Sequence, residues 1–299
     1  KFSFNEETAV NNYYQRQLLD QKVADVHNRA VKEFDDLVEK LYSNKINVII
    51  VNDSGINNTP DSIFPNNWVS FHEDGQVVLY PMFAKNRRSE RRLDIFDQLK
   101  ALHGFNISNI VDWTESENQN QFLEGTGSLV LDRSNKIAYA ALSERTDVEI
   151  IDKFCEHFSY DAVMFTASQT MEGKRLPIYH TNVMMCLAEE FAVICLECID
   201  DKKERKNVLR HLKEDGKEVI AISEAQVTNF AGNMLQVVGE NNKRYLVMSK
   251  SAYESLNKHQ IVSIEKHCEI IHSSLDTIEA CGGGSARCMM AEVFLPKSN

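Results

Sequence analysis

A recurring unit constrains the fold of this chain more than any other feature. Each unit has a small or polar loop, a strand, a tight turn and a second strand, and in most units an amphipathic helix follows. Repeats of about 50 residues are typical of arrays and propeller-like rings, because one unit cannot bury its apolar face alone. The loop residue before each strand recurs at intervals of 60, 55, 51 and 54 residues, at Asn67, Gly127, Asn182, Asn233 and Arg287.

We therefore predict an α/β fold in which five pseudo-symmetric ββαβ-type units close into a ring around a central site. The last unit is expected to contain one strand after the glycine run at 282–284, with its missing half supplied by the N-terminal region. Residues 5–42 predict one long amphipathic helix that leads into a buried strand at 46–52. The 299 residues suffice for one large domain or two ordinary ones.

The charge of the chain argues against nucleic-acid binding. The formal net charge is −11, whereas binding to phosphates requires clustered cationic side chains. The basic cluster at 85–92 is interpreted as the solvated start of a helix. No apolar run approaches the roughly 18 residues of a membrane-spanning helix, so we expect no contact with a membrane.

The seven cysteines form an odd number without the spacing of a disulfide scaffold, so we expect a reducing, cytoplasmic location. Cys195 and Cys198 have the spacing of a redox or metal motif, but they lie in a continuous apolar run that predicts a buried strand. His267, Cys268 and His272 lack a second pair that would complete a four-ligand zinc site. We expect neither a metal nor another cofactor.

Three residues suited to covalent catalysis fall on the aligned loops. Glu124, His180 and Cys288 each lie within three residues of an aligned position, so a ring brings a carboxylate, an imidazole and a thiol to one axis. Taken singly, each has an ordinary structural interpretation: a turn glutamate, a loop histidine and a core cysteine. A thiolate can attack a poorly electrophilic carbon, and an imidazole with the unperturbed pKa of about 6.5 can transfer the protons.

The loop motifs resemble those of a known family. FPNNW (64–68), FLEGTGSL (122–129), YHTNVMM (179–185), NFAGNML (229–235) and GGGSARCM (282–289) are similar, in this order, to motifs of the amidinotransferase or guanidino-modifying superfamily, most closely its citrulline-degrading hydrolase branch. The resemblance implies one catalytic domain over residues 1–299 with the pentein five-bladed α/β propeller fold. It also implies a nucleophilic Cys288, His180 as general acid and base, and Glu124 as the carboxylate that binds substrate nitrogen or orients the histidine.

The departures from this family pattern concern the substrate. Members that act on arginine place aspartates on the loops that hold the guanidinium, whereas the positions here are Asn67, Gly127 and Asn182. Neutral amides favour the uncharged ureido group of L-citrulline, because a guanidinium would lose charge-assisted hydrogen bonds. We therefore expect hydrolysis of citrulline to ornithine, ammonia and carbon dioxide. The alternatives are an arginine deiminase-type or N-acylarginine hydrolase, as in the related succinylarginine dihydrolase, and a non-catalytic amino-acid sensor.

The other candidates for substrate binding are Asn233 and three arginines. Arg87, Arg88 and Arg287 are candidates for holding the α-carboxylate, and a solvated helix remains the alternative for the first two. The expected partner is a small molecule, citrulline or an arginine-like amino acid. The sequence does not determine the oligomeric state.

Overall fold

The computed structural model of the protein describes residues 1–18, 22–53 and 55–297. Within these residues, four three-stranded sheets repeat one pattern, in which the first two strands are antiparallel and the third pairs in parallel with the second. The sheets are β1 (Val69–Phe71), β2 (Gln76–Leu79) and β3 (Asn109–Asp112); β4 (Leu129–Asp132), β5 (Ile137–Leu142) and β6 (Asp161–Thr166); β9 (Met185–Leu187), β10 (Phe191–Ile194) and β11 (Glu218–Ala221); β12 (Leu235–Val238), β13 (Arg244–Ser249) and β14 (Glu269–Ser273).

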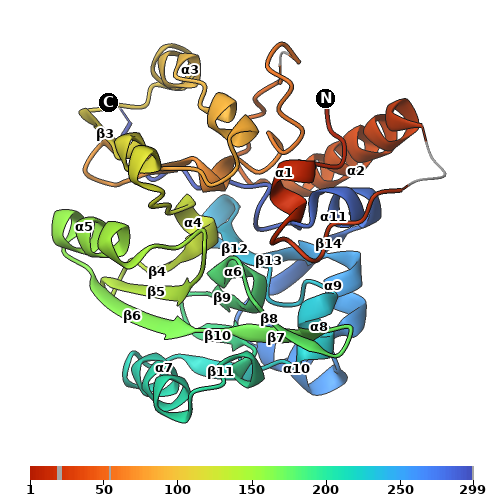
Figure 1. Ribbon diagram of the computed structural model, residues 1–299, viewed down its shortest axis with the longest axis vertical. Coiled ribbons are helices and arrows are strands. Elements are labelled where there is room, and N and C mark those ends of the chain that lie inside the picture. Colours follow the sequence, from red (N-terminus) through yellow and green to blue (C-terminus); the bar gives the residue numbers. More distant parts are fainter. Residues whose placement is uncertain (19–21, 54, 298–299) are drawn as a thin grey trace.

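Helices supply the crossover that each parallel pair needs. Figure 1 shows these helices at the periphery, whereas short helices that precede β4 and β9 lie near the middle. The four predicted ββαβ units are thus present in the described chain. The crossover helices are α3 (Asp94–His103), α5 (Val148–Phe158), α7 (Lys202–Glu214) and the pair α9 (Lys250–Ser255) and α10 (Lys258–Glu265); the short helices are α4 (Gly125–Ser128) and α6 (Thr181–Met184).

The other elements connect or extend these units. They are helices α1 (Glu6–Ala9), α2 (Val23–Ser43), α8 (Glu224–Thr228) and α11 (Asp276–Gly282), the hairpin β7 (Ser168–Met171) and β8 (Lys174–Pro177), and the 3₁₀ helices η1 (Pro65–Asn67), η2 (Asn86–Glu90), η3 (Thr114–Gln119), η4 (Leu196–Cys198) and η5 (Glu240–Asn242).

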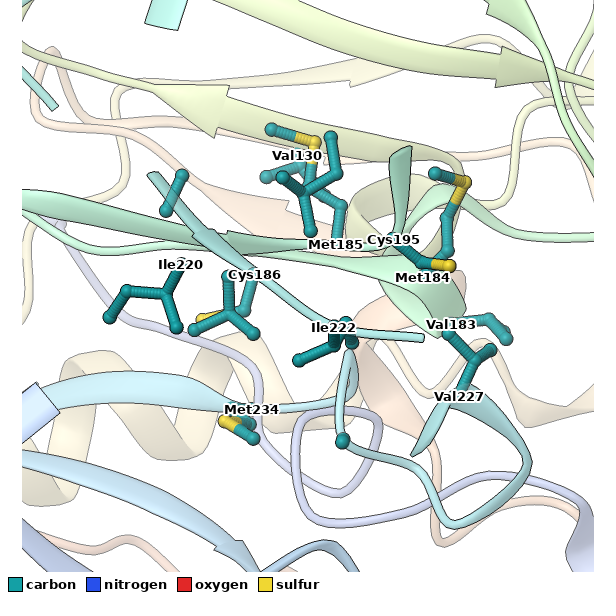
Figure 2. Close-up of a cluster of buried hydrophobic side chains, with 14 of the residues drawn as sticks. Val130, Val183, Met184, Met185, Cys186, Cys195, Ile220, Ile222, Val227 and Met234 are labelled. Carbon is teal, nitrogen blue, oxygen red and sulfur yellow. The ribbon is translucent and has the colours of Figure 1, made fainter. Parts of the chain in front are cut away.

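The first strands of neighbouring units share one core. Figure 2 shows Val130 of β4, Met185 of β9 and Met234, next to β12, in a single apolar cluster. The polar segments that precede these strands meet as well, because Asn233 Nδ2 donates to the Asn182 carbonyl at 2.9 Å and Asn182 Nδ2 donates to the Thr126 carbonyl at 3.2 Å. The packing of these strands therefore brings the ends of three units to one place.

The N-terminal region differs from the predicted single helix. Asn5 caps the short α1, and residues 10–18 are irregular before α2 begins at Val23. Asn11 and Asn12 explain the break, because their side chains bond to Arg145 and to glycine carbonyls of the 282–284 run instead of continuing a helix. No helix in the described part of the chain is both long and apolar enough to cross a membrane.

Two predicted strands are not formed. Residues 46–52 pair with no other strand in the described chain, and Ile50 and Val51 are exposed. The segment after the glycine run makes isolated bridges only, between Val293 and Phe71 and between Lys297 and Phe105. Apolar residues in these segments predicted strands, but a strand also requires a paired neighbour over several residues.

We predict that Phe154→Ala in α5 lowers the free energy of unfolding by about 3–5 kcal/mol, because removal of a fully buried phenyl ring leaves a cavity. Urea denaturation measures this change. Val148→Ala at the start of the same helix is the control, since Val148 is exposed and its truncation leaves stability nearly unchanged. Equal effects of the two substitutions would contradict the packing described for α5.

Candidate active site

The structure brings together the three residues that the sequence singled out for catalysis. Glu124 precedes α4, His180 precedes α6, and Cys288 lies in a turn at 286–289. His180 Nε2 is 2.8 Å from Glu124 Oε2. His180 and Cys288 line one small cavity with about 250 Å³ of empty space. All three side chains are buried, so water is largely excluded from them.

Glu124 is held as a carboxylate by its neighbours. Burial opposes its ionisation, but the charge of Arg145, the hydrogen bond from His180 and the charge of Arg87 hold its pKa well below the usual range. Arg145 Nη1 lies 3.5 Å from Glu124 Oε2, and the Phe83 N–H donates to Oε1 at 3.0 Å. An ionised carboxylate can only accept hydrogen bonds. His180 Nε2, which lies 2.8 Å from Glu124 Oε2, must therefore be the nitrogen that carries the hydrogen.

His180 is neutral at physiological pH. Burial lowers its pKa to about 4, against the raising effect of Glu124 and together with the charges of Arg145 and Arg87. The pKa of His180 is therefore lower than the unperturbed value of about 6.5 that the sequence suggested, because burial removes water from the charged form of the ring. With Nε2 donating to Glu124, Nδ1 is left as a proton acceptor.

Two asparagines contact the sulfur of Cys288. Asn233 Nδ2 is 3.2 Å and Asn182 Nδ2 is 3.6 Å from Cys288 Sγ. Asn233 is itself oriented, because Nδ2 also donates to the Asn182 carbonyl at 2.9 Å and Oδ1 accepts the Arg287 N–H at 3.1 Å. Neither asparagine lines the cavity that contains Cys288, and their predicted contact with substrate stays a prediction.

Arg87 is not on a solvated helix, as one interpretation of the basic cluster had it. The guanidinium is buried, and Nε and Nη2 each donate to Glu90 at 2.9 Å. Burial raises the pKa of Glu90 to about 7, although Arg87 lowers it. Arg87 Nη1 donates to Asn67 Oδ1 at 2.8 Å. Arg87 lines the cavity, while Arg88 is only partly buried and pairs with Glu117 at 3.2 Å.

Asn67 has one amide atom engaged and one free. Arg87 occupies Oδ1, whereas Nδ2 is buried without a hydrogen-bond partner among the described residues. A Cβ atom at Gly127 would lie 2.4 Å from Asn67 Nδ2 and 2.8 Å from His180 Nδ1. Glycine at 127 therefore lets these two side chains occupy the same small space.

Arg287 faces away from Cys288. Its Nη1 donates to the Met290 carbonyl at 2.9 Å, and its Nη2 pairs with Glu292 at 3.0 Å. The side chain lines a second cavity with about 910 Å³ of empty space, which Lys217 also lines. Arg287 is thus absent from the lining of the cavity that contains Cys288, and its predicted role in holding the substrate carboxylate stays a prediction.

Asp61 was missed in the sequence because it lies before the first repeated unit. It lines the cavity, and its Oδ2 accepts hydrogen bonds from Asn5 Nδ2 at 2.8 Å and Thr8 Oγ1 at 3.0 Å. Oδ1 is buried without a partner among the described residues. Burial raises the pKa of this carboxyl, opposed by Arg87 and by the two hydrogen bonds. Nothing in its local sequence distinguishes it from a turn aspartate.

Other residues that line the cavity were not singled out in the sequence, although two of them, Phe64 and Tyr179, lie in the quoted motifs. Arg145 donates to the Thr8 carbonyl at 2.8 Å and to Asn11, and its guanidinium lies 4.8 Å from the ring centre of Tyr179. Tyr179 donates to the Gly283 carbonyl at 2.6 Å. These contacts need a tertiary structure, since the residues that they join are 137 and 104 positions apart in the sequence. The residues missed are Thr8, Asn12, Asp61, Phe64, Arg145 and Tyr179.

The described residues offer no cluster suited to a metal ion. Cys195 and Cys198 are free and buried, but β10 ends at Ile194 and the second cysteine lies in η4, so the predicted strand does not extend through the pair. His267 lies between Glu190 and Glu218, at 3.2 and 3.0 Å. Both of its ring nitrogens are thereby engaged with carboxylates.

Comparisons with known proteins bear on the family and the fold of the chain. A family profile described as N,N dimethylarginine dimethylhydrolase, eukaryotic, matches residues 1–295. No curated protein matches the chain significantly in a sequence comparison.

Solved structures of similar fold include three informative cases. The apo structure of ArgZ, an arginine dihydrolase from cyanobacteria, has a TM-score of 0.68 at 18% identity, over 91% of this chain and 37% of that one. The product-bound N-terminal domain of ArgZ has a TM-score of 0.65 at 18% identity, over 90% and 88%. A dimethylarginine dimethylaminohydrolase adduct with S-methyl-L-thiocitrulline has a TM-score of 0.59 at 13% identity, over 88% and 87%.

The likeness to these structures shows a common fold, and this chain spans only 37% of the length of the full ArgZ chain. The profile match covers nearly the whole sequence. The chain therefore belongs to the eukaryotic N,N-dimethylarginine dimethylhydrolase family, within the pentein superfamily of guanidino-modifying enzymes.

Proposed function

We propose that this protein is a cysteine hydrolase that cleaves the ureido group of L-citrulline to give ornithine, ammonia and carbon dioxide. One observation carries the choice of substrate: the buried Nδ2 of Asn67 is an unpartnered donor in the cavity of Cys288 and His180. A ligand for this cavity must therefore present an acceptor to Asn67.

Arg87 determines the orientation of the Asn67 amide. A guanidinium has donors and no acceptor, so the atom of Asn67 that lies 2.8 Å from Arg87 Nη1 is the oxygen, and the nitrogen is the free atom. A substrate guanidinium also has only donors and would leave this N–H unpaired, at about 1–3 kcal/mol. The carbonyl oxygen of a ureido group accepts it.

The nitrogen side of a ureido group also finds partners. Asp61 Oδ1 is a free acceptor in the same cavity, suited to a ureido N–H or to the α-ammonium group of the amino acid. Asn67 and Asp61 together thus supply one donor and one acceptor. A ureido group matches both, because it carries a carbonyl and N–H groups on one planar carbon.

In the proposed reaction, the Cys288 thiol transfers its proton to His180 Nδ1, and the sulfur bonds to the ureido carbon. The imidazolium returns this proton to the departing nitrogen, ammonia leaves, and a thiocarbamate remains on Cys288. Water then attacks the same carbon and loses a proton to His180, and the sulfur leaves and is reprotonated. The resulting carbamate of ornithine releases carbon dioxide.

The surroundings of these groups support their assigned roles. Amide N–H groups of Asn233 and Asn182 lie within hydrogen-bonding distance of the sulfur and hold it in place. Glu124 orients the imidazole and stabilises its transient charge, as the acidic member of other nucleophile–histidine–carboxylate arrangements does. Neither step requires a cofactor.

The proposal includes one catalytic domain over residues 1–299, in a ring whose fifth position is taken by the segment that carries Cys288. The parallel bridge between Val293 and Phe71 supports this placement, because it joins the last segment to β1 of the first unit. All seven cysteines are free, as expected in the reducing cytoplasm.

A guanidino hydrolase acting on arginine, a methylated arginine or an N-acylarginine is the second candidate. The family to which the chain belongs favours it, and so does the free carboxylate oxygen of Asp61, which would form a charge-assisted hydrogen bond with a guanidinium. The two candidate functions use the same nucleophile. They differ in the substrate group that lies next to Asn67 Nδ2, which is a ureido carbonyl in the first and a guanidinium in the second.

Product analysis separates the candidates. Purified protein is incubated separately with L-citrulline, L-arginine and N,N-dimethylarginine, and ornithine, citrulline, ammonia and dimethylamine are measured. We expect ornithine and ammonia from citrulline, and loss of turnover of at least about 10³-fold in Cys288→Ser, because a serine hydroxyl ionises far less readily than a thiol. Citrulline as the product of either guanidino substrate would select the second candidate, and tight binding without turnover would indicate a sensor.

The substitution Asn67→Asp tests the choice of substrate directly. Aspartate keeps the acceptor for Arg87 but replaces the free N–H with an oxygen, so we expect kcat/KM for citrulline to fall by about 10- to 100-fold and activity on arginine to rise. Asn67→Ala is the matched variant, which loses the donor without adding a charge, and it should lower citrulline hydrolysis without any gain on arginine. Unchanged citrulline kinetics in both variants would contradict the proposal.

The pH profile tests the state of His180. The pKa of His180 is lowered to about 4, so the neutral base is present above this pH and is lost as the pH falls through it. We expect the acid limb of kcat/KM to centre near pH 4, measured with citrulline between pH 3.5 and 8. Circular dichroism at each pH excludes acid unfolding, and a limb centred near 6.5 would show that the ring is not desolvated in the working enzyme.

A further inference from the structure

A second buried carboxyl group lies next to the segment that carries the nucleophile. Glu279 in α11 accepts a hydrogen bond from Ser285 Oγ on Oε1 and from Ser251 Oγ on Oε2, both at 2.6 Å. The glutamate and Ser285 are both buried, and the proposed reaction gives neither a chemical role.

Glu279 contacts both ends of the loop that leads to Cys288. Its carbonyl accepts the Gly283 N–H at 2.9 Å, where glycine adopts a left-handed conformation with φ of 63° and ends α11. Its side chain holds Ser285, and the Ser285 carbonyl accepts the Cys288 N–H at 3.0 Å. One residue therefore fixes the start of the loop and the turn that presents the sulfur.

The other carboxylate oxygen connects this loop to the fourth unit. Ser251 Oγ, which donates to Glu279, lies 2.9 Å from Ser249 Oγ. Ser249 caps α9, because its hydroxyl accepts the Ala252 N–H at 3.1 Å. The nucleophile turn is thereby tied through Glu279 to the junction of β13 and α9, which is a rigid part of the fold.

We propose that Glu279 is a positioning residue that holds Cys288 in its reactive geometry through Ser285; this inference rests on the proposed function, in which Cys288 is the nucleophile. The carboxylate has the chemistry that this position needs, since it accepts two hydroxyl donors at once. Glutamine offers one accepting oxygen and would place an NH₂ group against one of the serines.

The energetics favour a role beyond stability. Burial raises the pKa of Glu279 to about 7, while hydrogen bonds from Ser249, Ser251 and Ser285 lower it. An apolar residue in this place would avoid this desolvation. The contribution of the carboxylate is the orientation of the turn at 286–289. This turn places Cys288 Sγ 3.2 Å from Asn233 Nδ2. A displacement of about 1 Å at a reacting group can slow a reaction about 100-fold.

The test compares Glu279→Gln, Ser285→Ala and the double variant by steady-state kinetics with the substrate that the protein turns over. We expect kcat to fall by about 10- to 100-fold in each single variant, with KM within about twofold of the parent, since binding groups such as Asp61 and Asn67 are untouched. The double variant is expected to be no slower than either single variant, because both changes break the same link.

Glu269→Gln is the matched control. The same substitution is made at an exposed residue of β14 that pairs with Lys243, and it should leave kcat, KM and the melting temperature unchanged. Melting temperatures of the other variants are measured in parallel. A loss of thermal stability in Glu279→Gln with a parental kcat would overturn the proposal, as would additive losses in the double variant.

A second readout does not depend on turnover. The rate of alkylation of Cys288 by iodoacetamide, followed by mass spectrometry, should fall in Glu279→Gln and Ser285→Ala, because the sulfur loses its amide donors when the turn is released. Unchanged alkylation in these variants would count against Glu279 as a positioning residue. Full activity of Cys288→Ser would instead refute the nucleophile itself, so the two failures are distinguishable.

Discussion

The site depends on one buried ion, the carboxylate of Glu124. An isolated charge in the interior is strongly unfavourable, and here Arg145 and Arg87 supply the opposite charge at 3.5 and 3.9 Å. His180 and the Phe83 N–H satisfy the carboxylate oxygens. Removal of one partner from such a group costs about 3–5 kcal/mol, because the remaining charges are left uncompensated. The imidazole orientation and the positions of both arginines are therefore parts of one arrangement.

Arg87 links this charge cluster to recognition of the substrate. It is bound on one side by Glu90 and donates on the other to Asn67 Oδ1. Arg87 thus determines that the oxygen of the Asn67 amide is occupied and that its N–H group is free. This N–H group can lie beside His180 because Gly127 has no side chain. In the proposed function, this chain of contacts makes Asn67 a donor for a carbonyl oxygen.

The repeats and the residues that meet at the candidate site could be predicted from the sequence because they depend on short-range patterns. Alternating apolar residues and turn signals predicted the strands of four units, and the spacing of the loops brought Glu124, His180 and Cys288 to one place. Sequence patterns gave a wrong prediction where contacts with a distant part of the chain determined the local structure. Asn11 and Asn12 interrupt the predicted N-terminal helix because Arg145 and the glycine carbonyls compete for their amides.

The sequence by itself determined the α/β class, the repeated unit and the choice of Glu124, His180 and Cys288 as neighbours in one site, since each follows from residue types at regular spacing. Tertiary structure alone decided that Arg87 is buried, that Arg287 faces the second cavity, that Asp61 joins the site, and that His180 has a pKa of about 4. The physical reason is that burial, charge pairing and hydrogen-bond direction arise between segments whose separation in the chain carries no local signal.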